Sequence, residues 1–416
     1  MNSKTNAQPA PSLRESFDKH VCQTSDAPLG LHIDRADGPW LYTTDGRRYL
    51  DFISGIGVAS IGHGRKEVYE AICDQASRFL HPMVYGEYIL EPQVSFATLL
   101  ARYLPGEIDN IFFANSGAEA VEGALKTARK YTGRSKIFSF EGCYHGDTFG
   151  ALSCMSGSLY KAPFEPVLPD VAHLKWNDIE ALSSIDTETA AVIIEPIQAE
   201  GGIRIPDAEF MHALRERCNK TGALLIYDEV MTGFARTGKI FAAAHWNIVP
   251  DIIVLAKALG GGLPLGAFAG NRNLMQVLAS DPPLSHVTTF GGHALSCAAG
   301  LAAFKLLLEE KLWEKAEKSG AYLLEGLKKL KTDCPGITNV RGKGCLAGIE
   351  FESSDLCMRF AADCQDEGII VGWTLHHSHI LRMAPPLILG NEQIDAALQT
   401  MKRVLTRSNS QKSNLQ

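Results

Sequence analysis

Lys257 is the residue of this sequence whose position is best suited to covalent chemistry. It directly follows the apolar run 253–256, and three glycines stand shortly after it, at 260–262. A lysine amine becomes nucleophilic where burial destabilises its ammonium form, and it then forms Schiff bases with carbonyl groups. The glycines let the backbone approach a bulky ligand. Taken alone, a lysine at the end of a strand is more often a solvated surface residue. Other residues of the site are needed to distinguish that interpretation from a Schiff-base lysine.

Asp228 ends a second apolar run, 224–227. A carboxylate at the end of a buried strand keeps the nitrogen of a pyridine ring protonated, which makes such a ring an electron sink. Without Lys257, the simpler interpretation is an aspartate that caps the turn into the next helix. Together the two residues favour a pyridine-based cofactor that bonds to an amine.

Two further segments are suited to such a cofactor. Ser116, Gly117 and Ala118 follow a strand and open a helix, so backbone N–H groups at the helix N-terminus can hold a phosphate. This signal is weak alone, because Ser-Gly before a helix is equally an ordinary cap. Tyr144 follows the strand expected at 136–140, where an aromatic ring can stack on a flat ligand. For a single tyrosine, packing in the core is the default.

The elements that must position these residues alternate between short buried strands and helices. Bounded apolar runs are typical of a mostly parallel sheet covered by helices, and in such folds ligands bind at the carboxyl ends of the strands. The predicted fold class is therefore α/β. Strands are expected at 110–114, 136–140, 191–194, 223–227 and 251–255, with helices at 119–131 and 208–220.

The chain changes character after residue 294, where long helices precede further strands. These helices are expected at 294–310, 312–331 and 392–406, and the strands at 346–351 and 380–383. A chain of 416 residues is too long for one simple core. We expect disordered ends at 1–12 and 407–416, a segment at 13–61 that packs with the small domain, a large domain at 62–300 and a small α+β domain at 301–406.

Composition argues against several classes of protein. A net charge of −7 disfavours binding to nucleic acid or to an acidic membrane, and no apolar run reaches the roughly 18 residues that span a bilayer. The ten cysteines show no CxxC pair and no zinc-ligand spacing, so we expect no metal site. Scattered thiols and the lack of a signal-peptide pattern predict a cytoplasmic location.

Six short motifs follow one another along the chain: Asn-Ser-Gly-Ala-Glu-Ala, Tyr-His-Gly, Glu-Pro, Asp-Glu-Val, Ala-Lys-Ala-Leu-Gly-Gly-Gly and Arg-Met-Ala-Pro-Pro-Leu. In this order they resemble those of the class III aminotransferases of PLP fold type I, the ornithine, acetylornithine and omega types, where PLP is pyridoxal 5′-phosphate. The resemblance runs from about Gly38 to Thr406. It implies a homodimer with active sites at the subunit interface.

The resemblance also implies roles for the residues that bind PLP. Lys257 would hold PLP as a Schiff base and later move a proton between substrate and cofactor, while Asp228 pairs with the pyridine nitrogen. Val230 would pack under the ring and Tyr144 would cover its other face. The remaining cofactor contacts are assigned to Ser116, Gly117, Ala118, His145, Glu195, Met231 and the partner's Thr289.

A second group of residues is implied in binding the substrate. Arg382 matches an arginine that holds a substrate carboxylate as a bidentate pair. Glu200 resembles a gate glutamate, which neutralises that arginine when an ω-amine enters and moves away for an oxo acid. A glutamate after a strand is otherwise more often solvated. Ile56 and Val58 are expected in the pocket wall, although core positions suit them equally well.

Two residues depart from the family pattern. Many members have glutamine at the position of Met231, where the amide helps to hold the phenolic oxygen of PLP. Methionine cannot donate a hydrogen bond, so another group or water must take over. Asp147 stands where acetylornithine-type and ornithine-type enzymes usually have an arginine for a substrate carboxylate. The aspartate disfavours an anion there; it either favours a cationic end or is simply solvated, which argues against plain N-acetylornithine specificity.

The leading hypothesis is an aminotransferase that moves an amino group from an amine or amino acid, such as an ω-amine, to an oxo acid such as 2-oxoglutarate or pyruvate. The alternative is an isomerase, either an amino-acid racemase or an aminomutase. Met231 supports that alternative, because it also occurs in the glutamate-semialdehyde aminomutase version of the Asp-Glu-Val-Met-Thr-Gly-Phe motif. Arg382 and Glu200 favour the aminotransferase.

Overall fold

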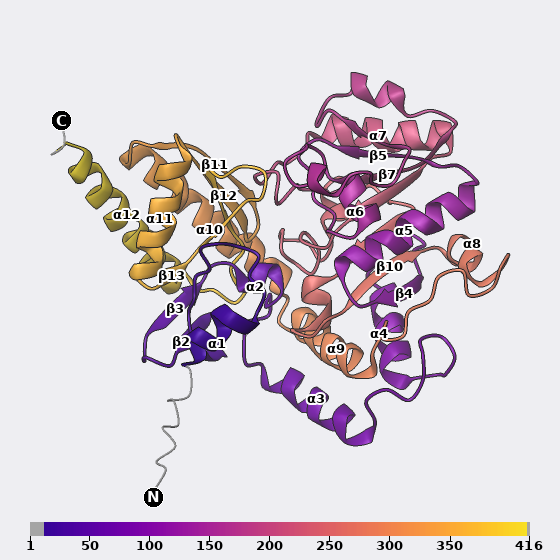
Figure 1. The fold of residues 1–416 in the computed structure, drawn as a ribbon, viewed down its shortest axis with the longest axis horizontal. Coiled ribbons are helices and arrows are strands. Elements are labelled where there is room, and N and C mark those ends of the chain that lie inside the picture. Colours follow the sequence, from indigo (N-terminus) through magenta and orange to yellow (C-terminus); the bar gives the residue numbers. More distant parts are fainter. Residues whose placement is uncertain (1–11, 414–416) are drawn as a thin grey trace, which may run out of the picture.

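The large lobe of the protein is built on a seven-stranded sheet (Figure 1). The structure, a computed structural model, describes residues 12–413, with side chains as far as residue 407. The strand order is β4-β10-β9-β8-β7-β5-β6, in which β10 is antiparallel to its two neighbours and the other pairs are parallel. The strands are β4 Asn110–Ala114, β5 Lys136–Phe140, β6 Val171–Leu174, β7 Thr189–Ile194, β8 Leu224–Asp228, β9 Ile252–Leu255 and β10 Gly266–Gly270.

Helices cover this sheet, as its apolar strands require. α5, Gly117–Thr132, packs on β7, β8, β9 and β10, and α7, Ala208–Thr221, packs beside β8. The side chain of Ser116 caps α5 by accepting a hydrogen bond from the backbone N–H of Glu119 at 3.2 Å. At the other end Gly133, with φ of 69°, ends the helix in the left-handed conformation that glycine tolerates. The predicted α/β class with a mainly parallel sheet is confirmed.

Two strands of this sheet, β6 and β10, are absent from the sequence prediction. The sequence of β10 is Gly-Ala-Phe-Ala-Gly, which lacks the branched side chains that mark buried strands. Small residues are required there because α5 lies close to the strand. A side chain added at Gly266 would collide with the backbone carbonyl of Ser116.

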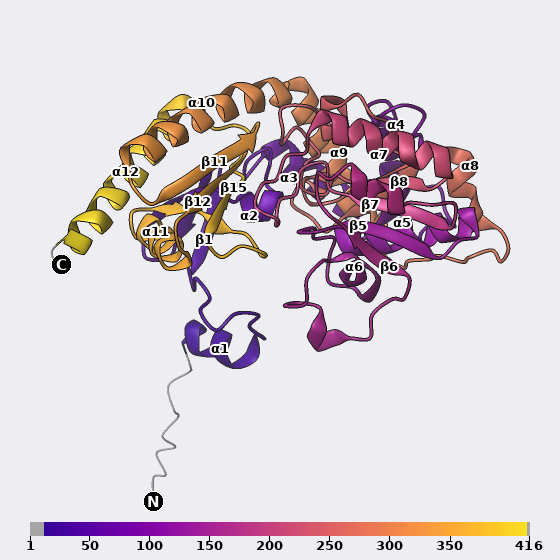
Figure 2. The same cartoon turned by 90° about the horizontal axis from the view of Figure 1, so that it is seen from above.

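The small lobe combines both ends of the chain (Figure 2). In its first sheet β3, from the N-terminal segment, pairs in parallel with β13 from the C-terminal part. Leu50 and Phe52 share a core with C-terminal residues such as Leu381. The first sheet contains β1 Ile33–Asp37, β2 Trp40–Thr43, β3 Arg48–Asp51 and β13 Ile369–Ile370, and the second contains β11 Ile337–Lys343, β12 Leu346–Phe351, β14 Gly372–Trp373 and β15 Ile380–Met383.

Besides α5 and α7, ten α-helices complete the described part of the chain. Those of the first hundred residues are α1 Leu13–His20, α2 Ser54–Gly57, α3 Lys66–Arg78 and α4 Glu91–Ala101. The others are α6 Phe149–Cys154, α8 Arg272–Met275, α9 Ala294–Glu309, α10 Leu312–Asp333, α11 Ser354–Asp366 and α12 Asn391–Ser413. None of the helices between residues 12 and 413 is long and apolar enough to cross a membrane.

Helices α9 and α10 link the lobes and shift the boundary expected at residue 300. α9 packs on α3 and α4 of the large lobe, so the expected boundary falls inside this helix. α10 then joins two cores, because Leu312 and Ala316 belong to the large-lobe core while Leu323 and Leu327 belong to the small-lobe core.

The structure also differs from the prediction at the chain ends. Ser12, expected in a disordered segment, forms a capping box with Glu15 at the start of α1. α12 continues to Ser413 instead of ending at 406, and Arg407 pairs at 2.5 Å with Glu367, the C-cap of α11. The rest of the predicted disorder, at 1–11 and 414–416, lies outside the described residues.

Candidate active site

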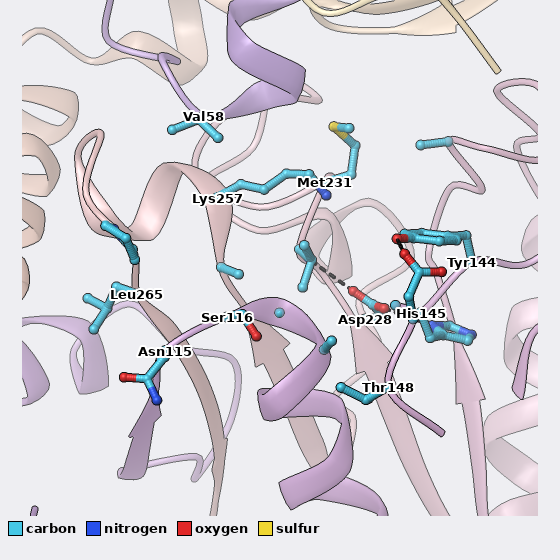
Figure 3. Close-up of a pocket in the computed structure, with 18 of the residues that line it drawn as sticks. Val58, Asn115, Ser116, Tyr144, His145, Thr148, Asp228, Met231, Lys257 and Leu265 are labelled. Atoms are coloured by element: carbon cyan, nitrogen blue, oxygen red, sulfur yellow. Dashed lines mark hydrogen bonds and ion pairs between the residues drawn. The ribbon is translucent and has the colours of Figure 1, made fainter. Parts of the chain in front are cut away.

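A cavity of about 720 Å³ opens at the carboxyl ends of the parallel strands (Figure 3). Five of the seven strands each position one chemically distinctive residue there. Ser116 follows β4, Tyr144 follows β5, Glu195 follows β7, Asp228 ends β8 and Lys257 follows β9. Residues separated by more than 140 positions therefore meet at one edge of the sheet, which is where ligands bind in open α/β folds.

Lys257 begins a short 3₁₀ helix, Lys257–Gly260, with φ of 49°. A left-handed conformation is unfavourable for a residue with a side chain, and such strain is concentrated at functional sites. Burial of the amine lowers the pKa of Lys257 from its usual value, although the carboxylates of Asp228 and Glu195 oppose that shift. The amine is therefore more readily deprotonated than one in water, as a nucleophile requires.

Asp228 is buried, and separate donors hold its two oxygens. Its Oδ2 lies 2.7 Å from Nδ1 of His145, and its Oδ1 accepts a hydrogen bond from the backbone N–H of Val230 at 3.0 Å. Burial disfavours a charge on His145, yet Cys143 and Asp228 hold the pKa of this imidazole well above its usual value. The two contacts fix the orientation of the carboxylate.

Glu195 and Asp147 fix the segment that carries Tyr144. The backbone N–H of Tyr144 donates to Oε1 of Glu195 at 3.0 Å, and its phenol donates to Oδ2 of Asp147 at 2.8 Å. Burial raises the pKa of Glu195 to about 7. The ring of Tyr144 stands at the edge of the cavity, across from Lys257 (Figure 3). Asp147 is exposed and lines the same cavity, so its charge faces any ligand there.

The N-terminus of α5 forms the floor of the cavity. The first N–H groups of a helix have no partner within it, and the Ser116 hydroxyl already serves that of Glu119. Gly117 packs tightly, because an added Cβ would lie 3.3 Å from Ala256 and Val230 side chains. Backbone donors at this place are suited to an anionic group.

Arg382 and Glu200 form an ion pair beside this cavity. Arg382 lies on β15 of the small lobe and is 5% exposed, and its Nη1 contacts Oε1 of Glu200. The other oxygen, Oε2, accepts a hydrogen bond from the backbone N–H of Leu375 at 2.9 Å. Burial lowers the pKa of Arg382 to about 10, which still leaves the guanidinium charged at neutral pH. The glutamate lines the cavity, whereas Arg382 is not one of the lining residues.

The structure does not bring every candidate residue into the cavity. Val58 lines it, but Ile56 does not; its side chain is 48% exposed and its backbone has φ of 63°. The family resemblance suggested that both residues belong to the pocket wall at the end of a strand, but the chain turns here into α2. Thr289 is exposed and does not line the cavity of its own chain. The neighbouring Thr288 binds Asn115 at 3.0 Å.

Two functional positions were missed by sequence reasoning. Gly57 leaves room for the Lys257 side chain, because an added Cβ would lie 2.8 Å from Sδ of Met231 and 3.6 Å from Cδ of Lys257. Its signal was the Gly-Ile-Gly pattern, from which only the isoleucine was chosen. Leu375, the second anchor of Glu200, gave no signal, because it acts through its backbone.

The comparisons with known proteins agree with this geometry. A family model for class III aminotransferases matches residues 21–405. The chain is similar to the acetylornithine aminotransferase of Methanosarcina acetivorans, with 40% identity over 395 residues, which cover 94% of this chain and 96% of the relative.

Solved structures give the same result. One is a transaminase from the marine bacterium Virgibacillus, with a TM-score of 0.91, 28% identity, and coverage of 96% of this chain and 100% of that one. Another is the ornithine aminotransferase of Toxoplasma gondii, with partial occupancy of PLP at its active site. Its TM-score is 0.89, its identity is 29%, and the match covers 96% of this chain and 95% of that one.

The chain therefore belongs to the class III aminotransferases. It is a PLP-dependent enzyme that transfers amino groups, as the sequence predicted. Nothing in the comparisons supports the alternative of a racemase or an aminomutase. The donor set of the cavity fits PLP, since it offers one lysine amine, a buried carboxylate bound to the ring of His145 and a helix N-terminus for a phosphate.

Proposed function

We propose that this aminotransferase takes an ω-amine as donor and an α-oxo acid as acceptor, and that both use the cavity beside Arg382 in turn. The Arg382–Glu200 ion pair carries this proposal. With Glu200 in place, the arginine is neutralised and the pocket suits a donor that has no carboxylate near the reacting amine. With Glu200 displaced, a buried guanidinium needs a new anion, and the carboxylate of an oxo acid supplies one.

Each of the proposed cofactor-binding residues has a separate role in the reaction. When bound, PLP withdraws electrons from the substrate carbon next to the transferred nitrogen. Lys257 Nζ would bond to the cofactor and then carry the proton that leaves that carbon. Asp228, oriented by His145, would hold the proton on the pyridine nitrogen. Tyr144 and Val230 both line the cavity and would cover the two faces of the ring.

The remaining residues would hold the other parts of the cofactor. The N-terminal turn of α5, Ser116 to Ala118, would hold the phosphate. Glu195 keeps the segment of Tyr144 in position through the backbone N–H of Tyr144. Met231 packs against Gly57 beside Lys257 and donates no hydrogen bond, so another group or water would have to bind the phenolic oxygen.

Asp147 supports a donor with a second positive charge. It stands at the mouth of the cavity as an exposed carboxylate, bound to the phenol of Tyr144. A carboxylate at this place repels the α-carboxylate of an amino acid such as N-acetylornithine and attracts an ammonium group. We therefore infer that a diamine or a similarly cationic amine is preferred.

A homodimer with shared active sites is the assembly that we propose. Thr289 is exposed in its own chain, and so are the apolar side chains of Val287 and Phe290 on either side of it, at 59% and 55%. Exposed apolar residues beside a polar one are typical of an interface.

We also propose a cytoplasmic location. The ten cysteines, all within the described part of the chain, are free, which supports this proposal.

The variant Glu200→Gln tests the proposed exchange. It removes the charge that neutralises Arg382, so α-amino acids such as glutamate should become better donors relative to ω-amines. We expect the ratio of kcat/KM for the ω-amine to that for glutamate to fall by about tenfold, which corresponds to the loss of one buried charge partner. Stopped-flow half-reactions followed by cofactor absorbance give both values. An unchanged ratio would show that Glu200 does not govern Arg382.

A further inference from the structure

The turn between β14 and β15, residues 374–379, passes directly over Glu200. The backbone N–H of Leu375 donates to Oε2 of Glu200 at 2.9 Å, and the backbone N–H of His376 donates to the carbonyl of Glu200 at 3.3 Å. Arg382 takes the other carboxylate oxygen, Oε1. Both oxygens of Glu200 are therefore bound, and moving its carboxylate breaks a contact with the turn as well as the ion pair.

The turn is itself tied to the large lobe through two side chains. Nε2 of His376 lies 3.0 Å from the backbone carbonyl of Cys143, the residue before Tyr144. A carbonyl only accepts hydrogen bonds, so Nε2 carries the proton in this contact. The hydroxyl of Tyr160 donates to the carbonyl of Leu375 at 3.0 Å, and its ring meets that of His376 edge to face at 6.3 Å.

The turn also has internal bonds that keep its shape. The hydroxyl of Thr374 donates to the carbonyl of His377 at 2.9 Å, and the backbone N–H of Ile380 donates to the same carbonyl at 3.0 Å. A turn closed in this way moves as one piece. A shift at His376 therefore carries the N–H of Leu375 with it.

We propose that residues 374–379 form a latch that holds Glu200 against Arg382, and that His376 is the positioning residue that keeps the latch closed. This inference rests on the proposed exchange at Arg382. The latch stabilises the arrangement that receives an ω-amine and opposes the one that receives an oxo acid. It thereby sets the balance between the two half-reactions, although His376 touches neither substrate.

The variant His376→Ala tests this inference in the holoenzyme. Without the contact to Cys143, the N–H of Leu375 no longer holds Glu200 firmly, and displacement of the carboxylate becomes easier. We expect the KM for 2-oxoglutarate to fall by about fivefold and kcat/KM for an ω-amine donor to fall by a similar factor, which is the effect of one lost hydrogen bond. His376→Gln, whose amide N–H can reach a carbonyl, should restore part of both values.

His379→Ala is the matched control, because it removes the same side chain from the same turn. His379 is 37% exposed at its side chain and lies 3.9 Å from Glu350, away from Glu200. Both half-reactions should stay unchanged in this variant. Tyr160→Phe removes only the hydroxyl that holds Leu375. Like His376→Ala, it should lower the KM for 2-oxoglutarate and lower kcat/KM for the ω-amine.

The two half-reactions together separate a latch from a merely structural role. A general loss of structure would weaken both half-reactions, and that outcome, or no change in either, would overturn the latch. If Glu200→Gln alters donor preference while His376→Ala does not, the latch fails and the proposed exchange stands. If Glu200→Gln has no effect, the exchange itself is wrong and the latch falls with it.

Discussion

The carboxylate of Asp228 is bound on one oxygen by the ring of His145 and on the other by the backbone N–H of Val230. Glu200 is held in the same manner, by Arg382 and the N–H of Leu375. The two carboxylates differ in what their release would leave behind. Displacement of Asp228 would leave an imidazole that can lose its proton, whereas displacement of Glu200 leaves a buried guanidinium that stays charged and needs another anion. That difference makes one a fixed group and the other an exchangeable one.

Asp147 gives a prediction at the scale of a single residue. In the variant Asp147→Asn, the preference for 1,4-diaminobutane over butylamine should fall by about fivefold, because an exposed charge pair contributes at most about 1 kcal/mol. Steady-state kcat/KM for the two amines measures this preference at constant oxo acid. Since Asn keeps the size of the side chain, an unaltered preference would mean that the carboxylate is simply solvated.

The turn at Lys257 depends on how helix α9 packs behind it. Gly300 of α9 lies against the backbone carbonyl of Leu259, two residues after Lys257, and an added Cβ would also lie 2.6 Å from Cε1 of Phe96. Both neighbours are buried and cannot move freely. The strained backbone of Lys257 is thus supported by a helix that begins 37 residues later in the sequence (294 − 257).

Gly300→Ala is the prediction that belongs to this element. The added methyl group should lower the free energy of unfolding by about 1–3 kcal/mol, as overpacking of a core does, and should lower kcat by displacing the Lys257 turn. Chemical denaturation and steady-state kinetics measure the two effects. Lys305→Ala, on the exposed face of the same helix, should change neither. Equal stability of Gly300→Ala and the unaltered enzyme would contradict this packing.

Sequence patterns predicted the elements whose apolar residues form a bounded run or recur at a regular spacing. The strands that end at Ala114, Phe140 and Leu255 were predicted from their apolar runs. β10 was missed because its glycines and alanines are required by the close packing of α5, which no local pattern reveals. The contact between Leu375 and Glu200 could not be predicted, for a similar reason. It joins a backbone group to a side chain 175 residues away.

At the scale of the whole molecule, the cavity draws on both lobes. Val58 comes from the N-terminal segment and Lys257 from the large lobe, while Arg382 of β15 in the small lobe binds Glu200, which lines the cavity. α10 spans the two cores and fixes their relation. Thr289 is the one proposed cofactor contact that does not face the cavity of its own chain, and a second subunit would supply it.

Mixing two inactive variants tests the shared active site. In a mixed dimer of Lys257→Ala and Thr289→Asp subunits, one site combines an intact Lys257 with the partner's intact Thr289. We therefore expect the mixture, after subunit exchange, to regain a substantial part of the activity that each variant lacks alone. If each site were built from one chain, every site would keep one defect and no activity would return.

A covalent bond between Lys257 and PLP is the feature on which the proposed chemistry depends most. Borohydride reduces the C=N bond between a lysine and the cofactor, so the reduced holoenzyme can be digested and its labelled peptide identified by mass spectrometry. We expect the cofactor on the peptide that contains Lys257, the one lysine among the described residues that line the cavity. We also expect that Lys257→Ala carries no label and has no transaminase activity. A label on another lysine of the unaltered enzyme, or turnover by Lys257→Ala, would contradict this assignment.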